Sequence, residues 1–227
     1  MDRKTWPAAA AIALMAAASA QAETPRELLV QAAFEDRSKA AALDHVREAR
    51  QAAVAAAQRA PDDPEPVVVG ATALVYHAKL TGSRSEAIAA RRAFEAAATR
   101  FPRNPEAHIA LAAWHLGLVS KYGRLVARAA VGAQKAVGLA AADRSIAIGG
   151  DRAMFAGLAA LLRLQLDPDD PRGRALAEQA SRAPTPTTID RHMRRAATAL
   201  LASLRSGDAK TTRLLAERLL PLGWYRD

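Results

Sequence analysis

The sequence predicts an all-α protein built as an α-solenoid of about five antiparallel helix pairs. The composition is 51% hydrophobic but only 4% aromatic, so alanine and leucine must supply most of the buried surface, and alanine is the best helix former. Runs of β-branched residues, which strands prefer, are nearly absent apart from Val67, Val68 and Val69. Short turns bounded by proline and preceded by capping residues recur along the chain. These observations together favour helices joined by tight turns.

The first 22 residues have the parts of a cleavable secretory signal peptide in the required order. Arg3 and Lys4 form a basic start, residues 8–18 an apolar core, and Ala20-Gln21-Ala22 a small-residue cleavage site. The core is shorter than the roughly 20 apolar residues that a membrane anchor needs. An Ala-rich frayed helix of a cytosolic protein is the alternative. We therefore expect residues 23–227 to form a mature helical-repeat domain that is soluble, periplasmic and without a membrane span.

Cysteine usage and charge limit the possible chemistry. The chain has no cysteine, which excludes disulfides, thiolate metal sites, cysteine nucleophiles and a lipid-modified cysteine after the signal. The net charge of +9 suits acidic proteins, anionic lipid or nucleic acid as partners. Export, and the lack of a basic run interleaved with aromatic residues, argue against nucleic acid. A solvated basic surface explains the same charge without a partner.

Capping signals set the helix starts in the first half of the chain. Thr24-Pro25-Arg26-Glu27 is typical of a capping box with proline at the first helical position. Asp63-Pro64-Glu65 and Asn104-Pro105-Glu106 repeat this start, and Ser83-Arg84-Ser85-Glu86 is predicted to form a second capping box. The expected helices of this half run from the Thr24 cap to a break at residues 36–38, over residues 39–59 and 64–80, from the Ser83 cap to residue 100, and over residues 105–121.

Glycine and proline divide the second half. A helical segment is expected over residues 124–148, with Gly132 and Gly138 inside it. Each glycine costs about 1 kcal/mol relative to alanine, so close packing or a break is expected there. Further helices are expected over residues 152–166, 172–183, 187–205 and 208–220. The total is about ten helices, and no turn is long enough to link separate domains.

An internal repeat links the two best-defined helices. Ala49, Ala53, Ala56 and Pro61 return 41 positions later as Ala90, Phe94, Ala97 and Pro102. A weaker third copy consists of Gly138, Ala142, Ser145 and Gly150. Recurring helix pairs stack to bury apolar faces that no single pair can bury alone.

These offsets resemble the tetratricopeptide-repeat superfamily. Ala90, Phe94, Ala97 and Pro102 match the second-helix pattern of that repeat, and Leu111, Ala112 and His115 match positions of its first helix. The chain departs from the family at His108, where tryptophan is usual, and in its longer interval. The resemblance implies a divergent, right-handed solenoid. The arrangement also looks like the helical companion proteins of tripartite periplasmic transporters.

The resemblance further implies a concave groove lined by the first helix of each pair. Its positions in two successive repeats are Glu65, Val68, Thr72, Val75 and Tyr76, then Glu106, Ile109, Ala113, Leu116 and Gly117. Such a groove is apolar with an acidic rim, and suits an extended peptide, a helix or an apolar small molecule. Inter-helix core explains most of the same side chains.

Other clusters have structural explanations beside functional ones. His77, His108 and His115 lack the H-E-x-x-H spacing of a zinc site, so packed histidines are favoured over metal ligands. Tyr76, Trp114 and Tyr122 either frame a ligand or fill helix interfaces. Helix capping accounts for the acidic turns at residues 62–63 and 167–170 without calcium. The basic residues Lys121, Arg124 and Arg128 are the best candidate for an anion-binding patch, with a solvated helix face as the alternative.

No nucleophile, phosphate-binding or dinucleotide-binding motif is present. We therefore expect an exported, non-enzymatic protein-protein interaction or scaffold module without cofactor or metal, whose partner is another protein or peptide. The alternatives are a periplasmic small-molecule-binding or transporter accessory protein, with an apolar or anionic ligand, and a helical enzyme of unrecognised type. The candidate groove or partner-binding residues are Tyr76, His77, Ile109, Trp114, Leu116, Lys121 and Arg124.

Overall fold

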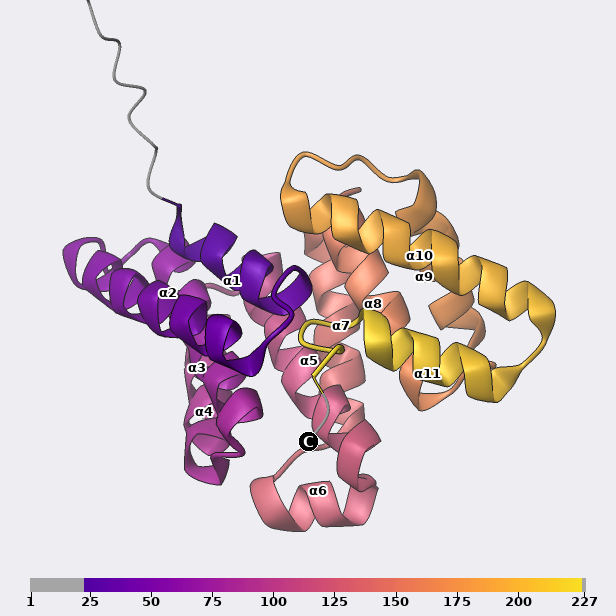
Figure 1. The fold of residues 1–227 in the computed structure, drawn as a ribbon, viewed down its shortest axis with the longest axis horizontal. Coiled ribbons are helices and arrows are strands. Elements are labelled where there is room, and N and C mark those ends of the chain that lie inside the picture. Colours follow the sequence, from indigo (N-terminus) through magenta and orange to yellow (C-terminus); the bar gives the residue numbers. More distant parts are fainter. Residues whose placement is uncertain (1–22, 226–227) are drawn as a thin grey trace, which may run out of the picture.

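The computed structural model describes residues 23–225, so the predicted signal peptide lies outside the described residues. Within this range the chain forms eleven helices and no strand, which confirms the all-α prediction (Figure 1). The helices are α1 (Pro25–Phe34), α2 (Lys39–Arg59), α3 (Pro64–Thr81), α4 (Arg84–Arg100), α5 (Pro105–Tyr122), α6 (Arg124–Val131), α7 (Lys135–Gly149), α8 (Ala153–Leu166), α9 (Pro171–Arg182), α10 (Thr188–Ser206) and α11 (Ala209–Leu219).

Side-chain caps start the first helices where the sequence predicts them. The Thr24 hydroxyl accepts a hydrogen bond from the Glu27 amide, and the Glu27 carboxylate accepts one from the Thr24 amide, so the predicted capping box is confirmed. Asp63 and Asn104 cap α3 and α5 in the same way, each with proline at the first helical position. Local chemistry thus sets these boundaries to within about a residue.

The second predicted capping box forms only in part. The Ser83 hydroxyl accepts from the Glu86 amide, as expected. The Glu86 carboxylate instead contacts His77 of α3 and Arg50 of α2. Two side chains from neighbouring helices replace the local backbone amide as partners of this carboxylate. Hydrogen bonds between charged groups are stronger than those to a neutral amide.

Gly132 divides the predicted segment 124–148 into two helices. Its φ of +79° is in the left-handed region that favours glycine, and a Cβ there would lie 2.2 Å from the Arg91 guanidinium. The two helices meet at an 88° bend, so the described part has eleven helices where about ten are predicted. No single described helix is long and apolar enough to cross a membrane; α6 and α7 reach that length and apolarity only together, across this bend.

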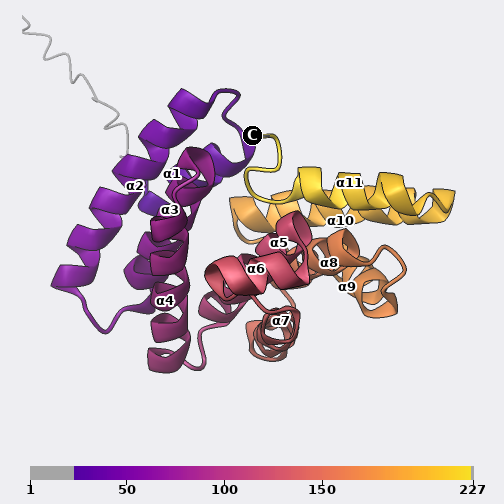
Figure 2. The same ribbon diagram turned by 90° about the horizontal axis from the view of Figure 1, so that it is seen from below.

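The first five helices pack on one another in chain order (Figures 1 and 2). Alanine faces allow their axes to approach closely: Ala49 and Ala53 of α2 are fully buried, as is Ala90 of α4. Phe94, the largest side chain of the 41-residue pattern, is 1% exposed. Five of the recurring positions are therefore core positions, whereas Ala56 is half-buried and Pro61 and Pro102 are exposed.

Helix α8 is the centre of the second half. Thirteen of its fourteen residues are buried, because α5, α7, α9, α10 and α11 all pack against it. Helix α5 packs mainly against α7, and the short α6 stands apart at one end of the molecule (Figure 1). The chain-order packing of α1–α5 is not maintained here, so the predicted arrangement of five helix pairs is not confirmed.

The segment after α11 returns to the first three helices. Leu222 is fully buried in the core of α1, α2 and α3, and its amide donates to the Ala33 carbonyl at 3.0 Å. Lys79 donates to the Pro221 carbonyl at 3.0 Å and the Tyr225 hydroxyl to the Leu80 carbonyl at 3.4 Å. Leu222 has a φ of +55°, which costs a non-glycine residue about 1–2 kcal/mol. Burial of its side chain offsets that cost.

Phe94→Ala should lower the free energy of unfolding by roughly 3–5 kcal/mol, because it leaves a cavity in the hydrophobic core to which this ring belongs. Denaturant unfolding followed by circular dichroism measures the change. Val54→Ala is the matched control, since Val54 is 48% exposed and its loss creates no cavity. A loss below about 1 kcal/mol for Phe94→Ala would contradict the core position of this ring.

Candidate partner-binding surface

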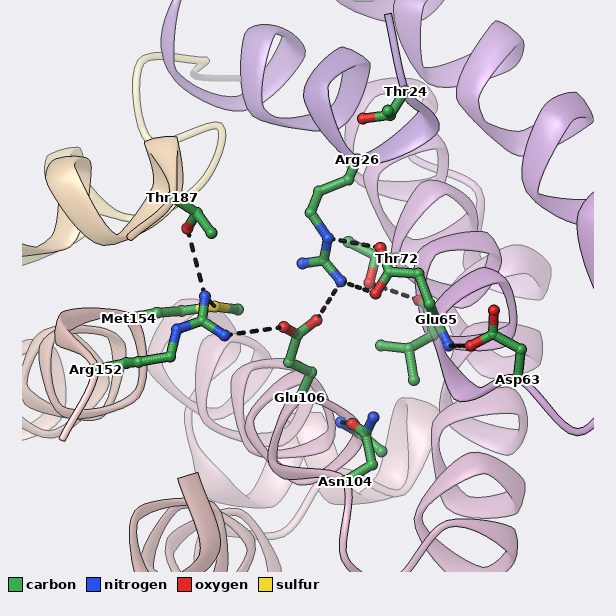
Figure 3. Close-up of polar contacts among 12 residues, drawn as sticks. Thr24, Arg26, Asp63, Glu65, Thr72, Asn104, Glu106, Arg152, Met154 and Thr187 are labelled. Carbon is green, nitrogen blue, oxygen red and sulfur yellow. Dashed lines mark hydrogen bonds and ion pairs between the residues drawn. The ribbon is translucent and has the colours of Figure 1, made fainter. Parts of the chain in front are cut away.

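The N-terminal ends of five helices meet, and charged side chains there form a connected network (Figure 3). Arg26 of α1 contacts Glu65 of α3 and, at 2.6 Å, Glu106 of α5. Arg152, directly before α8, lies 3.9 Å from Glu106 and 2.9 Å from Asp190 of α10. Positive and negative groups alternate along this chain of contacts, which joins the first half of the molecule to the second.

Asp190 is the fully buried member of the network. It accepts hydrogen bonds from the Met154 amide at 2.8 Å and the Thr187 hydroxyl at 2.6 Å, in addition to Arg152. Burial raises the pKa of Asp190, but these hydrogen bonds and the charge of Arg152 outweigh it, so that the pKa is lowered. It also accepts from the Thr187 amide at 3.2 Å, so the carboxylate satisfies one N-terminal amide of α8 and one of α10.

The acidic rim predicted from Glu65 and Glu106 is neutralised within the chain. Burial disfavours the charged form of Arg26, but its contacts with both carboxylates outweigh this and raise its pKa above the usual value. Arg152 adds a second cation beside Glu106. The network thus fastens helices together, and its carboxylates already have cationic partners.

The apolar residues predicted to line a groove lie in the core. Ile109, Trp114 and Leu116 are 1%, 4% and 0% exposed, and the Trp114 indole donates to the Ala87 carbonyl at 2.8 Å. Neighbouring helices bury these three side chains, so the structure does not expose them as a groove. Their contact with a partner stays a prediction.

The remaining predicted groove residues make contacts inside the protein. Tyr76 packs against the core of α1–α3, and burial raises its pKa. The Nδ1 atom of His77 lies 2.6 Å from Glu86 Oε2, and the Thr72 hydroxyl donates to the Val68 carbonyl at 2.9 Å. The polar groups of His77 and Thr72 therefore already contact residues of α4 and α3. Val75, Ala113 and Gly117 are half-buried.

The three histidines considered as metal ligands do not converge. His77 contacts Glu86, His108 Nε2 lies 3.1 Å from the Pro102 carbonyl, and His115 Nδ1 accepts from the Gln134 amide at 3.1 Å. Among residues 23–225 no group of three or more histidine or acidic side chains is placed to hold a metal ion.

His115 is a buried histidine held neutral. Its ring packs edge-on against Trp114, with centroids 4.9 Å apart. Burial, and secondarily the nearby charge of Arg91, lower its pKa to about 4. The neutral ring can accept the Gln134 amide, so it fixes the start of α7 as a hydrogen-bond acceptor.

The end of the molecule that carries α6 exposes large apolar side chains among cations. Tyr122, Leu125 and Val126 are 48%, 85% and 57% exposed. Arg124 and Arg128 flank them, and neither makes an ion pair or hydrogen bond with another residue in the described range. We term these five residues the α6 surface. Beside it, the Lys121 ammonium lies 5.4 Å from the centre of the Tyr122 ring.

Helix α4 holds α6 in place. Arg84 Nε donates to the Ala130 carbonyl at 3.0 Å, and Arg91 donates to the Val131 carbonyl at 3.1 Å. Cations are favoured at a helix C-terminus, where carbonyls lack partners within the helix. On the inner side Ala127 is fully buried. The exposed residues therefore stand on a fixed helix.

Sequence reasoning identified part of this surface and missed part. Lys121, Arg124 and Arg128 are predicted as an anion-binding patch, and the structure keeps them at the surface. The exposure of Leu125 and Val126 was not predicted. The sequence does contain a signal for this exposure. A short helix between Gly123 and Gly132 can bury only one face, and Ala127 lies on that face, so the larger residues lie on the outer face.

The sequence also contains an indication of the cations in the ion network. Arg26 stands in the first turn of α1 and Arg152 directly precedes α8. The helix dipole disfavours positive charge at these positions. A cation there indicates a partner carboxylate from elsewhere in the fold.

Comparison of the chain with protein-family models, curated proteins and solved structures gives no match. The tetratricopeptide-like resemblance therefore rests on the residues of this chain.

Asp190→Asn should lower the free energy of unfolding by about 2–3 kcal/mol, because Arg152 loses its charged partner and the buried hydrogen bonds weaken. Urea unfolding at neutral pH measures the change. Asp62→Asn is the matched control: that side chain is 95% exposed in its pair with Arg100, and surface pairs contribute little. Equal effects of the two changes would contradict the structural role of Asp190.

Acidification should destabilise the protein partly through His115. Between about pH 6.5 and pH 4 the unfolded chain binds a proton on this ring that the folded chain does not, so stability falls as pH is lowered through that window. His115→Gln removes this contribution. The unfolding free energy of the wild type minus that of the variant should therefore decrease from pH 7 to pH 4.5. A difference that stays constant with pH would contradict the lowered pKa.

Proposed function

We propose that this chain is an exported, non-enzymatic protein-protein interaction module of the tetratricopeptide-like class, and that its partner docks on the α6 surface. The observation that carries the proposal is Leu125, 85% exposed beside Val126 at 57%. Apolar area removed from water on docking stabilises a complex by about 25 cal/mol per Å². Adjacent exposed apolar residues on a folded helix are typical of interaction sites.

The charges around Leu125 indicate the chemistry of the partner. Arg124 and Arg128 lie one turn apart on the same face of α6, beside Leu125, and have no acidic neighbour in contact in the described part. A protein surface with an apolar patch beside aspartate or glutamate complements this pattern. Arginine and tyrosine are also the residues that most often dominate binding energy in such interfaces.

The fixed position of α6 strengthens this interpretation. Arg84 and Arg91 hold its C-terminal end through carbonyl hydrogen bonds. A surface that is already ordered loses less conformational entropy on binding than a flexible loop does. Docking on α6 therefore needs no prior folding step in this protein.

The fold and the N-terminus support the remaining parts of the proposal. Chain-order packing of α1–α5, with alanines of the 41-residue pattern in the core, fits a right-handed solenoid of helix pairs that becomes irregular after α5. Residues 1–22 have the order of a signal peptide, which supports a partner in the periplasm. Catalysis has no support from the histidines, whose partners are separate.

Leu125→Asp should abolish partner capture, because it places a charge at the centre of the apolar contact. Tagged wild-type and variant proteins are cross-linked in the periplasm of the source organism, captured and identified by mass spectrometry. The candidate partner is then purified and its affinity measured directly. We expect at least a tenfold loss for Leu125→Asp, since central interface residues cost more than 1 kcal/mol when changed.

Val54→Asp is the matched control, because Val54 is 48% exposed on α2, outside the α6 surface. It should bind the partner as the wild type does. Equal binding by both variants would contradict docking on α6. Binding of anionic lipid vesicles by the wild type, lost in Leu125→Asp and without any protein partner, would replace the protein partner by a membrane surface.

A further inference from the structure

A cavity of about 230 Å³ lies beside the start of α6 and is distinct from the apolar part of the α6 surface. It is formed where the end of α5, the starts of α6 and α7, the end of α8 and one side of α11 meet. Its lining residues are Val119, Ser120, Gly123, Arg124, Lys135, Gln165, Leu166 and Arg213. Three of these are cations and none is acidic, so the cavity has an uncompensated positive charge.

The three cations have no partners in the described residues. Arg124, Lys135 and Arg213 are exposed and make no ion pair or hydrogen bond with other described residues. They come from α6, α7 and α11, so only the folded chain brings them to one cavity. Like charges gathered without a counter-charge repel one another, and a bound anion removes that repulsion.

The helix ends at the cavity add to this positive field. Helices α6 and α7 start without a side-chain cap, and their first residues are Arg124 and Lys135. Helix α8 also lacks a cap of its own, but Asp190 satisfies the amide of Met154 in its first turn. At α7, His115 satisfies only the amide of Gln134, which precedes the helix. Unpaired amides and the helix dipole both favour an anion at such a terminus.

Gln165 provides an independent indication of a ligand. Its side chain is 7% exposed, and its Oε1 atom is buried without a hydrogen-bond partner in the described part of the chain. A buried acceptor left unpaired costs about 1–3 kcal/mol. Because Oε1 accepts hydrogen bonds, the group that satisfies it must carry an O–H or N–H. The Ser120 hydroxyl, half-buried in the same lining, is free to donate to an oxyanion.

We propose that this cavity binds a small oxyanion that also carries a hydroxyl group, such as hydrogen phosphate or a 2-hydroxycarboxylate. Arg124, Lys135 and Arg213 hold the charged oxygens together with the free amides of α6 and α7. Gln165 Oε1 accepts the hydroxyl of the same molecule. The cavity is smaller than the 300 Å³ or more typical of drug-sized ligands, which favours a small anion.

Two matched pairs of anions test the proposal by isothermal titration calorimetry of the purified protein, at constant ionic strength. Phosphate is compared with sulfate at pH 6.5, and lactate with acetate; only the first member of each pair carries a hydroxyl. We expect at least one hydroxylated anion to bind more tightly than its partner. The pair that shows the preference identifies the phosphate or the carboxylate source. No binding by either pair up to about 10 mM, where even weak sites fill, or equal binding within both pairs, would overturn the proposal.

Variants locate the binding. Lys135→Gln and Arg213→Gln should each lower the affinity for the preferred anion about tenfold, which is the effect of losing one charged hydrogen bond. Arg218→Gln removes an equally exposed cation of α11 that does not line the cavity and should leave affinity unchanged. Gln165→Leu should remove the preference for the hydroxylated anion while acetate or sulfate binding persists. Unchanged affinity in both cation variants, or weakening by Arg218→Gln alone, would overturn the site.

The anion site and the proposed protein partner are tested separately. Leu125→Asp changes no lining residue of the cavity and should retain anion binding, and thermal melting verifies that each variant is folded. Loss of anion binding in Leu125→Asp with an unchanged melting temperature would contradict the separation of the two sites.

Discussion

Burial of α8 on every side is the constraint on which the second half of the molecule depends. Five helices pack around it, so its side chains must be small enough to let them approach. At Gly157 an added Cβ would lie 2.8 Å from the Cβ of Met193 in α10, too close for any other residue without a shift. The one charged side chain inside the helix, Arg163, is 8% exposed and reaches Asp143 at 2.8 Å and Asp170 at 3.1 Å. A buried cation at such a centre is tolerable only with carboxylates supplied by the surrounding helices.

The two ends of the molecule differ in whether their charged side chains are paired. At the meeting point of α1, α3, α5, α8 and α10, carboxylates and guanidinium groups alternate (Figure 3). Asp190 accepts from N-terminal amides of both α8 and α10. At the α6 end the described cations Arg124, Lys135 and Arg213 face no carboxylate in contact. The protein thus balances its internal charges where helices must be fastened and leaves them unbalanced beside exposed apolar residues. That contrast is why the functional proposals concern the second end.

Local signals made the helices predictable, whereas their lateral packing was not. The helix starts at Thr24, Asp63 and Asn104 are predictable because each capping side chain bonds to an amide within the next three residues. The pairing of α5 with α7, or the five-fold surrounding of α8, depends on which alanine-lined faces meet, and these faces are chemically alike. The candidate site divides in the same way. Arg124 and Arg128 stand close together in sequence and are predicted as part of an anion-binding patch, but Lys135, Gln165 and Arg213 reach the cavity from three separate helices.

The return of the chain to its first helices has a consequence for biogenesis. Contacts such as Lys79 with Pro221 and Tyr225 with Leu80 join residues 142 and 145 positions apart. As the chain leaves the ribosome, α1–α3 emerge long before the residues that cover them. Their apolar surface around Leu80 stays open to solvent, or to a chaperone, for most of translation. Contacts of such long range slow the final closing step, and incompletely covered helices are prone to aggregate. A chain that ends before Leu222 would therefore leave the apolar face of α1–α3 exposed to solvent.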